Sequence, residues 1–372
     1  MKTKPNILFS LDGFLFHFCL AYYLQSHLDA NFYGLIDINS KPKKFFESQT
    51  LVQFQKIWFF HDHIKKTRQE PDLDYLSNFE NTYKIDLWKH AINERFFYLH
   101  NRFYKFKKQE ILSILEQELK LFESILDEIQ PDYFLTYIPV FHNQKLLQEL
   151  CRSRGIKVLA AYLTGVKNKM ILAEDGATFD LNRDSIGKHS IEQKLDKQTT
   201  YDSLFSNFLT GRNTSISNKL LALKDYLLTS DSSLINSNFM YYGRTKFKVV
   251  KDALNLELKR KRNFHFLQKH STTSPDLNVP FVYFPMNVVE EYNLLHYAPF
   301  YTDQIEVIRH IAKSIPVDYT LYVKEHRGAR IRGWNSIDYY KEILDIPNVK
   351  LIHPNADNDV LMQHSKLVAT LR

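Results

Sequence analysis

The spacing of hydrophobic positions predicts alternating strands and helices near the amino terminus. Residues 6–10 predict a strand, and residues 14–25, after a short polar turn, predict a helix. Apolar residues then recur every three or four positions from Ile111 to Ile129, which is typical of one buried helix face, and Pro131 ends that pattern.

The same alternation continues after this helix and returns near the carboxyl terminus. A strand at 133–138, a helix at 143–154 and a strand at 156–162 imply parallel strands joined by right-handed crossovers. The later part repeats the order with strands at 281–284, 319–324, 349–352 and 367–370, and helices at 303–315, 337–344 and 359–363. We therefore predict an α/β protein with two Rossmann-like domains built on parallel sheets.

These segments divide the chain into three regions. We predict a Rossmann-like domain over 1–167, a mostly helical or irregular inter-domain region over 168–278, and a partial Rossmann-like domain over 279–372. The last strand is not followed by a helix that would cover its sheet. We therefore expect the second domain to be truncated, either in a fragment or in a natural variant without catalysis.

Composition narrows the class of protein. With 44% hydrophobic and 24% charged residues and a mean hydropathy of −0.35, the chain is expected to be globular, and no apolar run reaches the roughly 20 residues of a membrane span. Two cysteines exclude a disulfide framework and a cysteine zinc site. The amino terminus lacks a small-residue cleavage site, so we expect a cytoplasmic protein.

Glycine-rich phosphate loops are absent. The chain has 10 glycines and contains neither G-x-G-x-x-G nor G-x-x-x-x-G-K-[ST], which argues against a typical dinucleotide-binding domain and a P-loop NTPase. The run His61-Asp62-His63 has no third ligand nearby, so surface polar residues are favoured over a metal site. We predict neither a metal nor a cofactor.

Positive charge is concentrated in one segment. Residues 241–270 hold nine basic and two acidic residues, a net of +7 that equals the formal charge of the whole chain. This local strip argues against a nucleic-acid-binding face spread over a domain. Three interpretations stay open: an amphipathic helix docked through Val249, Val250, Leu254 and Leu258 with a solvated basic face, contact with the anionic headgroups of the inner membrane surface, and contact with an anionic polymer.

Candidate site residues follow the predicted strands, because open α/β sheets bind ligands beyond the carboxyl ends of their strands. Asp12 and His17 follow the first strand, although Asp12 also suits a simple helix start. Glu290 and Glu291 follow the strand at 281–284, and His353 follows the strand at 349–352.

The most basic of these places follows the strand at 319–324. Its cationic side chains can bind a diphosphate through charge-assisted hydrogen bonds without a glycine loop, the alternative being a solvated basic loop. They are Lys324, His326, Arg327, Arg330 and Arg332. A further candidate is Asp175 in the acidic turn Glu174-Asp175-Gly176, which can supply a general base or be an ordinary surface turn.

Runs in the second predicted domain resemble bacterial capsule and surface polysaccharide biosynthesis proteins, which are glycosyltransferases of the GT-B architecture. The resemblance covers about 90 residues and is carried by Phe281-Val-Tyr-Phe-Pro285, Leu321-Tyr-Val-Lys-Glu-His326, Pro347-Asn-Val-Lys-Leu-Ile-His-Pro354 and Ser365-Lys-Leu-Val-Ala-Thr370. Arg327 stands where that family has a proline. The turn at Asp175 also resembles the acidic motif of related bacterial sialyltransferases.

The resemblance implies a function. It implies transfer of a sugar from a nucleotide sugar, held by the second domain, to a polysaccharide or glycolipid acceptor presented by the first domain. His326 is expected to meet the donor phosphate, with Asp175 or Asp12 as the catalytic carboxylate and Asp12 and His17 on the acceptor side. A non-catalytic polysaccharide-binding or export protein and a sugar-nucleotide epimerase are the alternatives.

Overall fold

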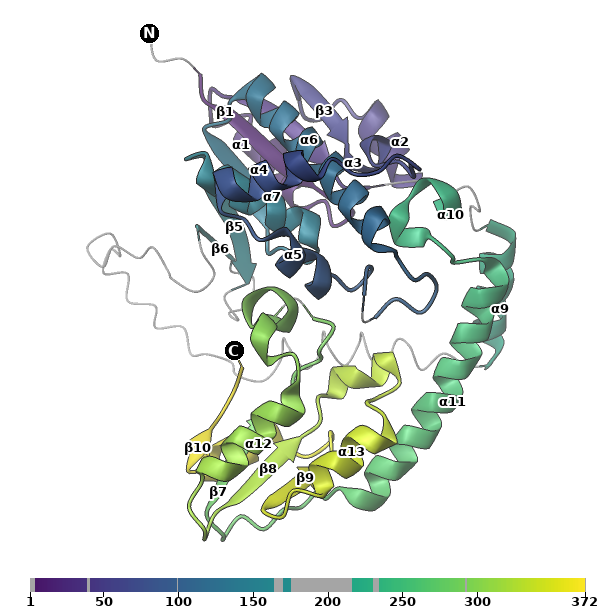
Figure 1. Ribbon diagram of the computed structural model, residues 1–372, viewed down its shortest axis with the longest axis vertical. Coiled ribbons are helices and arrows are strands. Elements are labelled where there is room, and N and C mark those ends of the chain that lie inside the picture. The colour runs from purple at the N-terminus through teal and green to yellow at the C-terminus, as the bar shows by residue number, and fades with distance from the viewer. Residues whose placement is uncertain are drawn as a thin grey trace, which may run out of the picture. The chain divides into compact units, whose positions relative to one another are not determined.

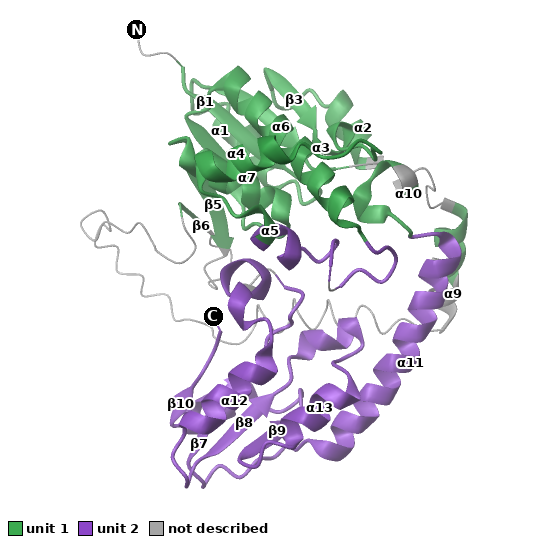
Figure 2. Ribbon diagram, in the orientation of Figure 1, with its two compact units in different colours: residues 1–88, 106–243 green, residues 89–105, 244–372 purple. Residues whose placement is uncertain are grey.

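A computed structural model gives the fold of the chain (Figure 1). The structure describes residues 4–38, 41–98, 100–163, 170–174, 216–229, 234–291 and 293–371. The chain forms two compact units (Figure 2). Unit 1 comprises residues 1–88 and 106–243, and unit 2 comprises residues 89–105 and 244–372. Each unit contains one sheet and several helices, which confirms the predicted α/β class.

Unit 1 is built on a six-stranded sheet in the order β3-β2-β1-β4-β5-β6. Its strands are β1 (Asn6–Leu11), β2 (Asn31–Ile36), β3 (Lys56–Phe59), β4 (Tyr133–Tyr137), β5 (Lys157–Leu163) and β6 (Met170–Ala173). All neighbours pair in parallel except β5 and β6, which pair antiparallel. The chain runs outward from β1 through β2 to β3 and then crosses back to β4, so β1 and β4 form the switch point at which such sheets bind ligands.

Unit 1 contains the helices predicted near 14–25, 111–129 and 143–154, together with further helices, and four described helices follow one another between β3 and β4. The helices of the unit are α1 (Phe16–Leu24), α2 (Lys41–Ser48), α3 (Phe60–His63), α4 (Leu73–Tyr83), α5 (Leu87–Asn93), which runs on into unit 2, α6 (Lys108–Ile129), α7 (His142–Ser153), α9 (Ile216–Thr229), α10 (Leu234–Ser237) and the 3₁₀ turn η2 (Phe239–Tyr241). The predicted apolar face of α6 is buried from Ile111 to Ile129. Gln130 then takes a left-handed conformation and Pro131 prevents continuation.

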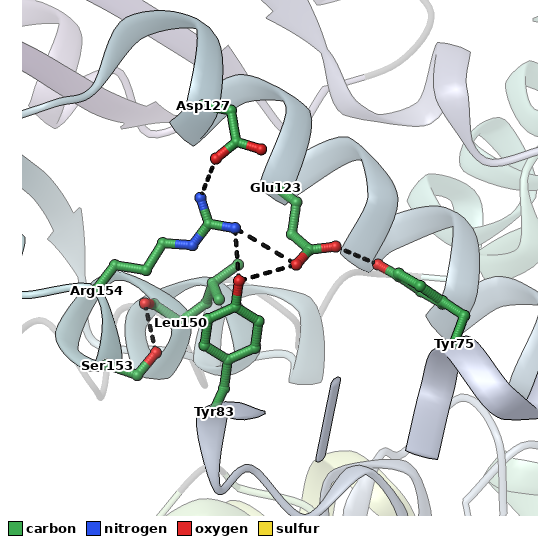
Figure 3. A network of polar contacts seen from close by, with 7 residues as sticks. All are labelled: Tyr75, Tyr83, Glu123, Asp127, Leu150, Ser153 and Arg154. Atoms are coloured by element: carbon green, nitrogen blue, oxygen red, sulfur yellow. Dashed lines mark hydrogen bonds and ion pairs between the residues drawn. The ribbon is translucent and has the colours of Figure 1, made fainter. Parts of the chain in front are cut away.

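A polar network ties α4, α6 and α7 together (Figure 3). The Arg154 guanidinium, just after α7, lies 2.5 Å from Oδ1 of Asp127 and donates to the Tyr83 hydroxyl at 2.7 Å. The hydroxyls of Tyr75 and Tyr83 donate to Glu123 at 2.6 and 3.0 Å. Because α6 precedes β4 and α7 precedes β5, these helix ends lie at the amino ends of the strands. The network therefore stabilises the edge opposite to the ligand-binding edge.

Unit 2 contains a four-stranded parallel sheet in the order β10-β7-β8-β9. Its strands are β7 (Phe281–Pro285), β8 (Thr320–Lys324), β9 (Val349–Ile352) and β10 (Leu367–Val368). Its helices and turns are α11 (Lys246–His270), η3 (Asn293–Tyr297), η4 (Pro299–Tyr301), α12 (Gln304–Ser314), η5 (Arg327–Arg332), α13 (Ile337–Leu344) and α14 (Asn358–His364). Side-chain caps explain where the helices begin: Asp303 caps α12, Ser336 caps α13 and Asp357 caps α14.

The unit boundaries differ from the three regions predicted from the sequence. Residues 89–105 belong to unit 2 because their side chains pair with residues far along the chain. The His100 ring lies 3.2 Å from Glu290, Arg102 lies 3.3 Å from Asp252, and Arg244 stacks over Phe103. No local pattern reveals pairs that are so distant in sequence.

The basic segment forms the predicted helix, α11, but not with the predicted docking stripe. Leu254 and Leu258 are 64% and 68% exposed. The helix packs instead through the opposite side, where Asn263 and Leu267 are fully buried. The expectation of docking through Leu254 and Leu258 is therefore wrong, because buried contacts occupy the other face.

The network around Arg154 gives a stability prediction. We expect Arg154→Ala to lower the free energy of unfolding by about 1–2 kcal/mol, because Glu123 and Asp127 lose their cation in a half-buried setting. Arg309→Ala is the matched control, since Arg309 also contacts two carboxylates, Glu306 and Glu342, but on an open surface. The free energy of unfolding of both variants is measured by urea unfolding, which is monitored by hydrogen exchange in each unit. Equal losses would contradict the role given to the network.

Candidate functional site

The carboxyl ends of β8 and β9 bring several predicted residues together in unit 2. The two strands pair in parallel with Lys324 opposite Ile352, so the residues that follow each strand meet at one edge. Lys324, His326 and Arg327 come from the end of β8, and His353 comes from the end of β9. The Arg327 side chain joins the two loops, because its Nε donates to the Pro354 carbonyl at 2.9 Å.

Lys324 is the buried cation of this edge. Its side chain is 3% exposed, and Nζ donates to Oδ1 of Asn358, which also accepts a 2.9 Å hydrogen bond from the Tyr283 hydroxyl. No described carboxylate lies within ion-pair distance of Nζ. Burial, and then the charge of Arg327, lower the pKa of Lys324 to about 8. The protonated lysine is therefore under-compensated at neutral pH.

Glu325 fixes the loop that carries these cations. Its carboxylate is buried and accepts from the Tyr340 hydroxyl at 2.5 Å, from Asn335 Nδ2 at 2.8 Å and from the backbone N–H of His326 at 2.7 Å. Burial raises its pKa, although these donors act in the opposite direction. Glu325 therefore binds β8 to α13 and cannot neutralise Lys324, which makes its own contacts near α14.

His326 and His353 both use Nδ1 to accept a hydrogen bond from a backbone N–H at this edge. Nδ1 of His326 accepts from the Gly328 N–H at 3.0 Å, and Nδ1 of His353 accepts from the Asn355 N–H at 3.2 Å. Each neutral ring therefore carries its proton on Nε2. Burial and then the charge of Lys324 lower the pKa of both rings. Both are neutral hydrogen-bond donors rather than extra fixed charges near pH 7.

The close turn after His326 depends on glycine. A Cβ atom at Gly328 would lie 2.8 Å from Nδ1 of His326, so any other residue would displace the ring. The ring also caps the 3₁₀ turn η5 through this bond.

The remaining predicted arginines lie within η5. The Arg330 side chain is exposed and its carbonyl accepts from Arg260 Nε at 2.9 Å. Arg332 pairs with Glu290 at 2.6 Å, and Glu290 is also in contact with His100. The basic run is therefore divided between the strand edge and an ion-pair cluster.

That cluster accounts for both predicted glutamates. Burial acts to raise the pKa of Glu290, but the bond to His100 and the charge of Arg332 hold it below its usual value. Burial raises the pKa of Glu291, opposed by Arg332 and Arg95. Glu290 forms an ion pair with Arg332, whereas Glu291 lies near the positive charges of Arg332 and Arg95.

The corresponding edge of unit 1 holds Asp12 and His17. Oδ1 of Asp12 accepts from the Phe14 N–H at 3.0 Å, and burial together with the nearby Asp37 charge raises the Asp12 pKa against that bond. His17 is buried and its Nε2 donates to the Thr136 carbonyl of β4 at 2.8 Å. Burial lowers the pKa of His17 to about 4, so the ring is neutral and bridges the β1–β4 switch point.

Further polar residues at this edge were not predicted from the sequence. Asp37 follows β2 and accepts from His61 Nε2 at 2.9 Å and from Asn143 Nδ2 at 3.3 Å. Asp37, Asn143 and Ser10 line a small pocket with room for about one water molecule. The rule that finds residues just after strands would have found Asp37. His61 was noticed only as part of a surface triplet, yet its side chain is 8% exposed.

A buried contact between a histidine and a glutamate supports the same edge. His142 and Glu118 are both fully buried and lie 2.9 Å apart, which joins the start of α7 to the middle of α6. Asp175, the other predicted catalytic carboxylate, lies outside the described residues. Its neighbour Glu174 pairs with Lys157 at 3.1 Å.

The described residues contain neither a metal-ligand cluster nor a membrane-spanning helix. No group of three or more potential metal ligands occurs among them. No described helix is both long enough and apolar enough to cross a membrane.

No family model matches the sequence, and no curated protein matches it. The likeness to capsule biosynthesis proteins therefore remains an expectation from short runs of residues.

Tyr340 gives a pH-dependent test of the Glu325 anchor. We expect Tyr340→Phe to lower the free energy of unfolding by about 1–3 kcal/mol, because the buried carboxylate loses a donor. The variant disfavours the charged form of Glu325 and raises its pKa further, so the loss of stability should be larger at pH 8 than at pH 5.

Tyr339→Phe is the control for this test. The Tyr339 hydroxyl is buried without a hydrogen-bond partner among the described residues, so its removal should cost less at either pH. Urea unfolding curves at both pH values measure the difference. A loss of stability that is the same at both pH values, or that Tyr339→Phe shows equally, would contradict the role of Glu325 in holding the loop.

Proposed function

We propose that the protein is a glycosyltransferase of capsular or surface polysaccharide biosynthesis that binds the diphosphate of a nucleotide sugar at the carboxyl edge of the unit 2 sheet. One observation carries the proposal. Lys324 is buried, the charge of Arg327 further disfavours its charge, and no described carboxylate forms an ion pair with it, although the charge of Asp357 acts in the opposite direction. Burying a lysine in this way costs folding free energy that an anionic ligand would offset.

A diphosphate suits the chemistry of these groups. Lys324 offers a point charge and Arg327 a planar fork, while the Nε2–H groups of His326 and His353 add neutral donors. None of these contacts needs a glycine-rich loop, which the sequence lacks. Arg330 and Arg332 lie within η5, where the Arg330 carbonyl accepts from Arg260 and Arg332 pairs with Glu290, so we assign them no direct contact with the phosphates.

The reaction follows from the proposed ligand. The acceptor hydroxyl oxygen forms a bond to the anomeric carbon of the donor sugar, and the bond from that carbon to the phosphate oxygen breaks. The nucleoside diphosphate leaves with the electron pair, and the cations of unit 2 stabilise its negative charge. We assign the hydroxyl proton to a carboxylate. Asp12 is the described candidate because its pKa is raised, and Asp175 is the candidate from the sequence.

The acceptor is proposed to be a polysaccharide or a glycolipid at the cytoplasmic face of the membrane. A non-catalytic polysaccharide-binding protein and a sugar-nucleotide epimerase are separate outcomes of the test. The binder would take the polymer without nucleotide affinity, and the epimerase would convert a free nucleotide sugar without an acceptor.

The test measures nucleotide binding and its pH dependence. We expect one of UDP, GDP and dTDP to bind in isothermal titration, and Lys324→Met or Arg327→Met to weaken that binding about 10- to 100-fold. Affinity of the native protein falls as pH rises through about 8, because Lys324 then loses its charge. Lys324→Arg keeps the charge and should lose this pH dependence.

Lys350→Met is the matched control, since Lys350 lies exposed on β9 of the same sheet. Binding that no variant weakens, or no binding to any of the nucleotides, would refute the proposed site. Nucleotide binding without sugar transfer to an added acceptor would support the proposed binding site but contradict the proposed transferase activity.

A further inference from the structure

Helix α11 has two faces of different character. Its inner face packs on unit 2: Leu267 is fully buried, and the Asn263 side chain, also buried, donates to the carbonyls of Gly333 at 3.2 Å and Asn335 at 2.7 Å. A Cβ atom at Gly333 would lie 2.9 Å from Cδ1 of Leu256, so Leu256 also belongs to this inner face. These contacts fix which side of the helix faces outward.

The outer face carries large apolar side chains that no packing explains. Phe247, Leu254 and Leu258 are 76%, 64% and 68% exposed. Their spacing of seven and four residues places them on one stripe of the helix. A stripe of this size along one helix is unlike singly scattered exposed residues, which need no explanation.

Cations surround this apolar stripe. Lys248, Lys251, Lys259, Lys261, Arg262 and Lys269 are all exposed. None of the six pairs with a described carboxylate. The helical repeat places Lys251, Lys261 and Arg262 beside the apolar stripe.

The acidic residues of α11 are both neutralised elsewhere. Asp252 pairs with Arg102 at 3.3 Å, and Glu257 pairs with Arg260 at 2.6 Å. The outward stripe therefore combines apolar side chains with unpaired cations and contains no carboxylate. The helix is about 37 Å long, so the stripe can lie flat over several lipid headgroups.

We propose that the outer face of α11 binds the surface of a membrane that contains anionic lipids. The unpaired cations match the negative headgroups, and Phe247, Leu254 and Leu258 insert at the level of the acyl chains. An anionic polymer would satisfy the charges but would leave the three apolar side chains in water. This proposal does not depend on the glycosyltransferase assignment, because it uses neither nucleotide nor acceptor.

Flotation with vesicles tests the proposal directly. We expect the full chain to bind vesicles of phosphatidylcholine mixed with phosphatidylglycerol, and to bind pure phosphatidylcholine much more weakly. Salt at about 1 M, where the screening length is about 3 Å, should weaken the first interaction strongly. Replacing Lys251, Lys261 and Arg262 by Gln should lower the partition coefficient on the order of 100-fold.

The apolar contribution has its own variant and matched controls. Phe247→Gln, Leu254→Gln and Leu258→Gln combined should reduce binding about tenfold or more while all charges remain. The control for this variant replaces Phe300, Val317 and Met362 by Gln, three other exposed apolar residues of unit 2. The control for the charge variant replaces Lys313, Lys350 and Lys366 by Gln, which are exposed elsewhere on the unit.

Tryptophan fluorescence distinguishes insertion of the apolar side chains into the membrane from electrostatic attraction to its surface. With anionic vesicles, Leu258→Trp should shift the emission to the blue relative to the native protein, which has three tryptophans, whereas Val360→Trp should not. Circular dichroism confirms that each variant is folded. Binding to heparin without binding to vesicles would contradict the proposal and indicate that the ligand of this face is an anionic polymer. Vesicle binding that both α11 variants leave unchanged would overturn the proposal.

Discussion

The buried carboxylate of Glu325 is the interaction on which the unit 2 site depends. It receives three hydrogen bonds, from the Tyr340 hydroxyl, from Asn335 and from the His326 N–H, and so holds the loop after β8 against α13. A buried carboxylate that lost these donors would be costly, so the loop has little freedom. This constraint turns His326 toward Gly328 and leaves Lys324 to make its contacts on the side of Asn358 and Tyr283.

The two sheet edges have opposite electrostatic character. At the unit 2 edge, burial and like charge act together on Lys324, and the neighbouring histidines are kept neutral. At the unit 1 edge, burial and then the charge of Asp37 raise the pKa of Asp12, while His61 and Asn143 donate to Asp37. The same fold rule therefore gives a cationic edge in one unit and a carboxylate edge in the other.

Ion pairs and buried polar side chains also decide what is left exposed. Asn263 holds one face of α11 against the rest of unit 2. Asp252 pairs with Arg102 and Glu257 pairs with Arg260, so the outer face of the helix carries no unpaired carboxylate. The exposed stripe is thus a consequence of how the inner face is held. A helix with the same composition and a different buried face would show a different surface.

The sequence by itself determined the local elements and which residues follow the carboxyl ends of the strands. Periodicity over a few residues encodes them, so the bounds of α13 and β9 agree with the predicted ones, and the rule for strand ends found Lys324, His326 and His353. Only the tertiary structure decided which distant side chains meet. The pairing of Arg332 with Glu290, the association of residues 89–105 with unit 2, the contact of His61 with Asp37 and the exposure of Leu254 and Leu258 have no local signal. Each depends on contacts between segments tens to hundreds of residues apart, which the repeat of a single helix or strand does not encode.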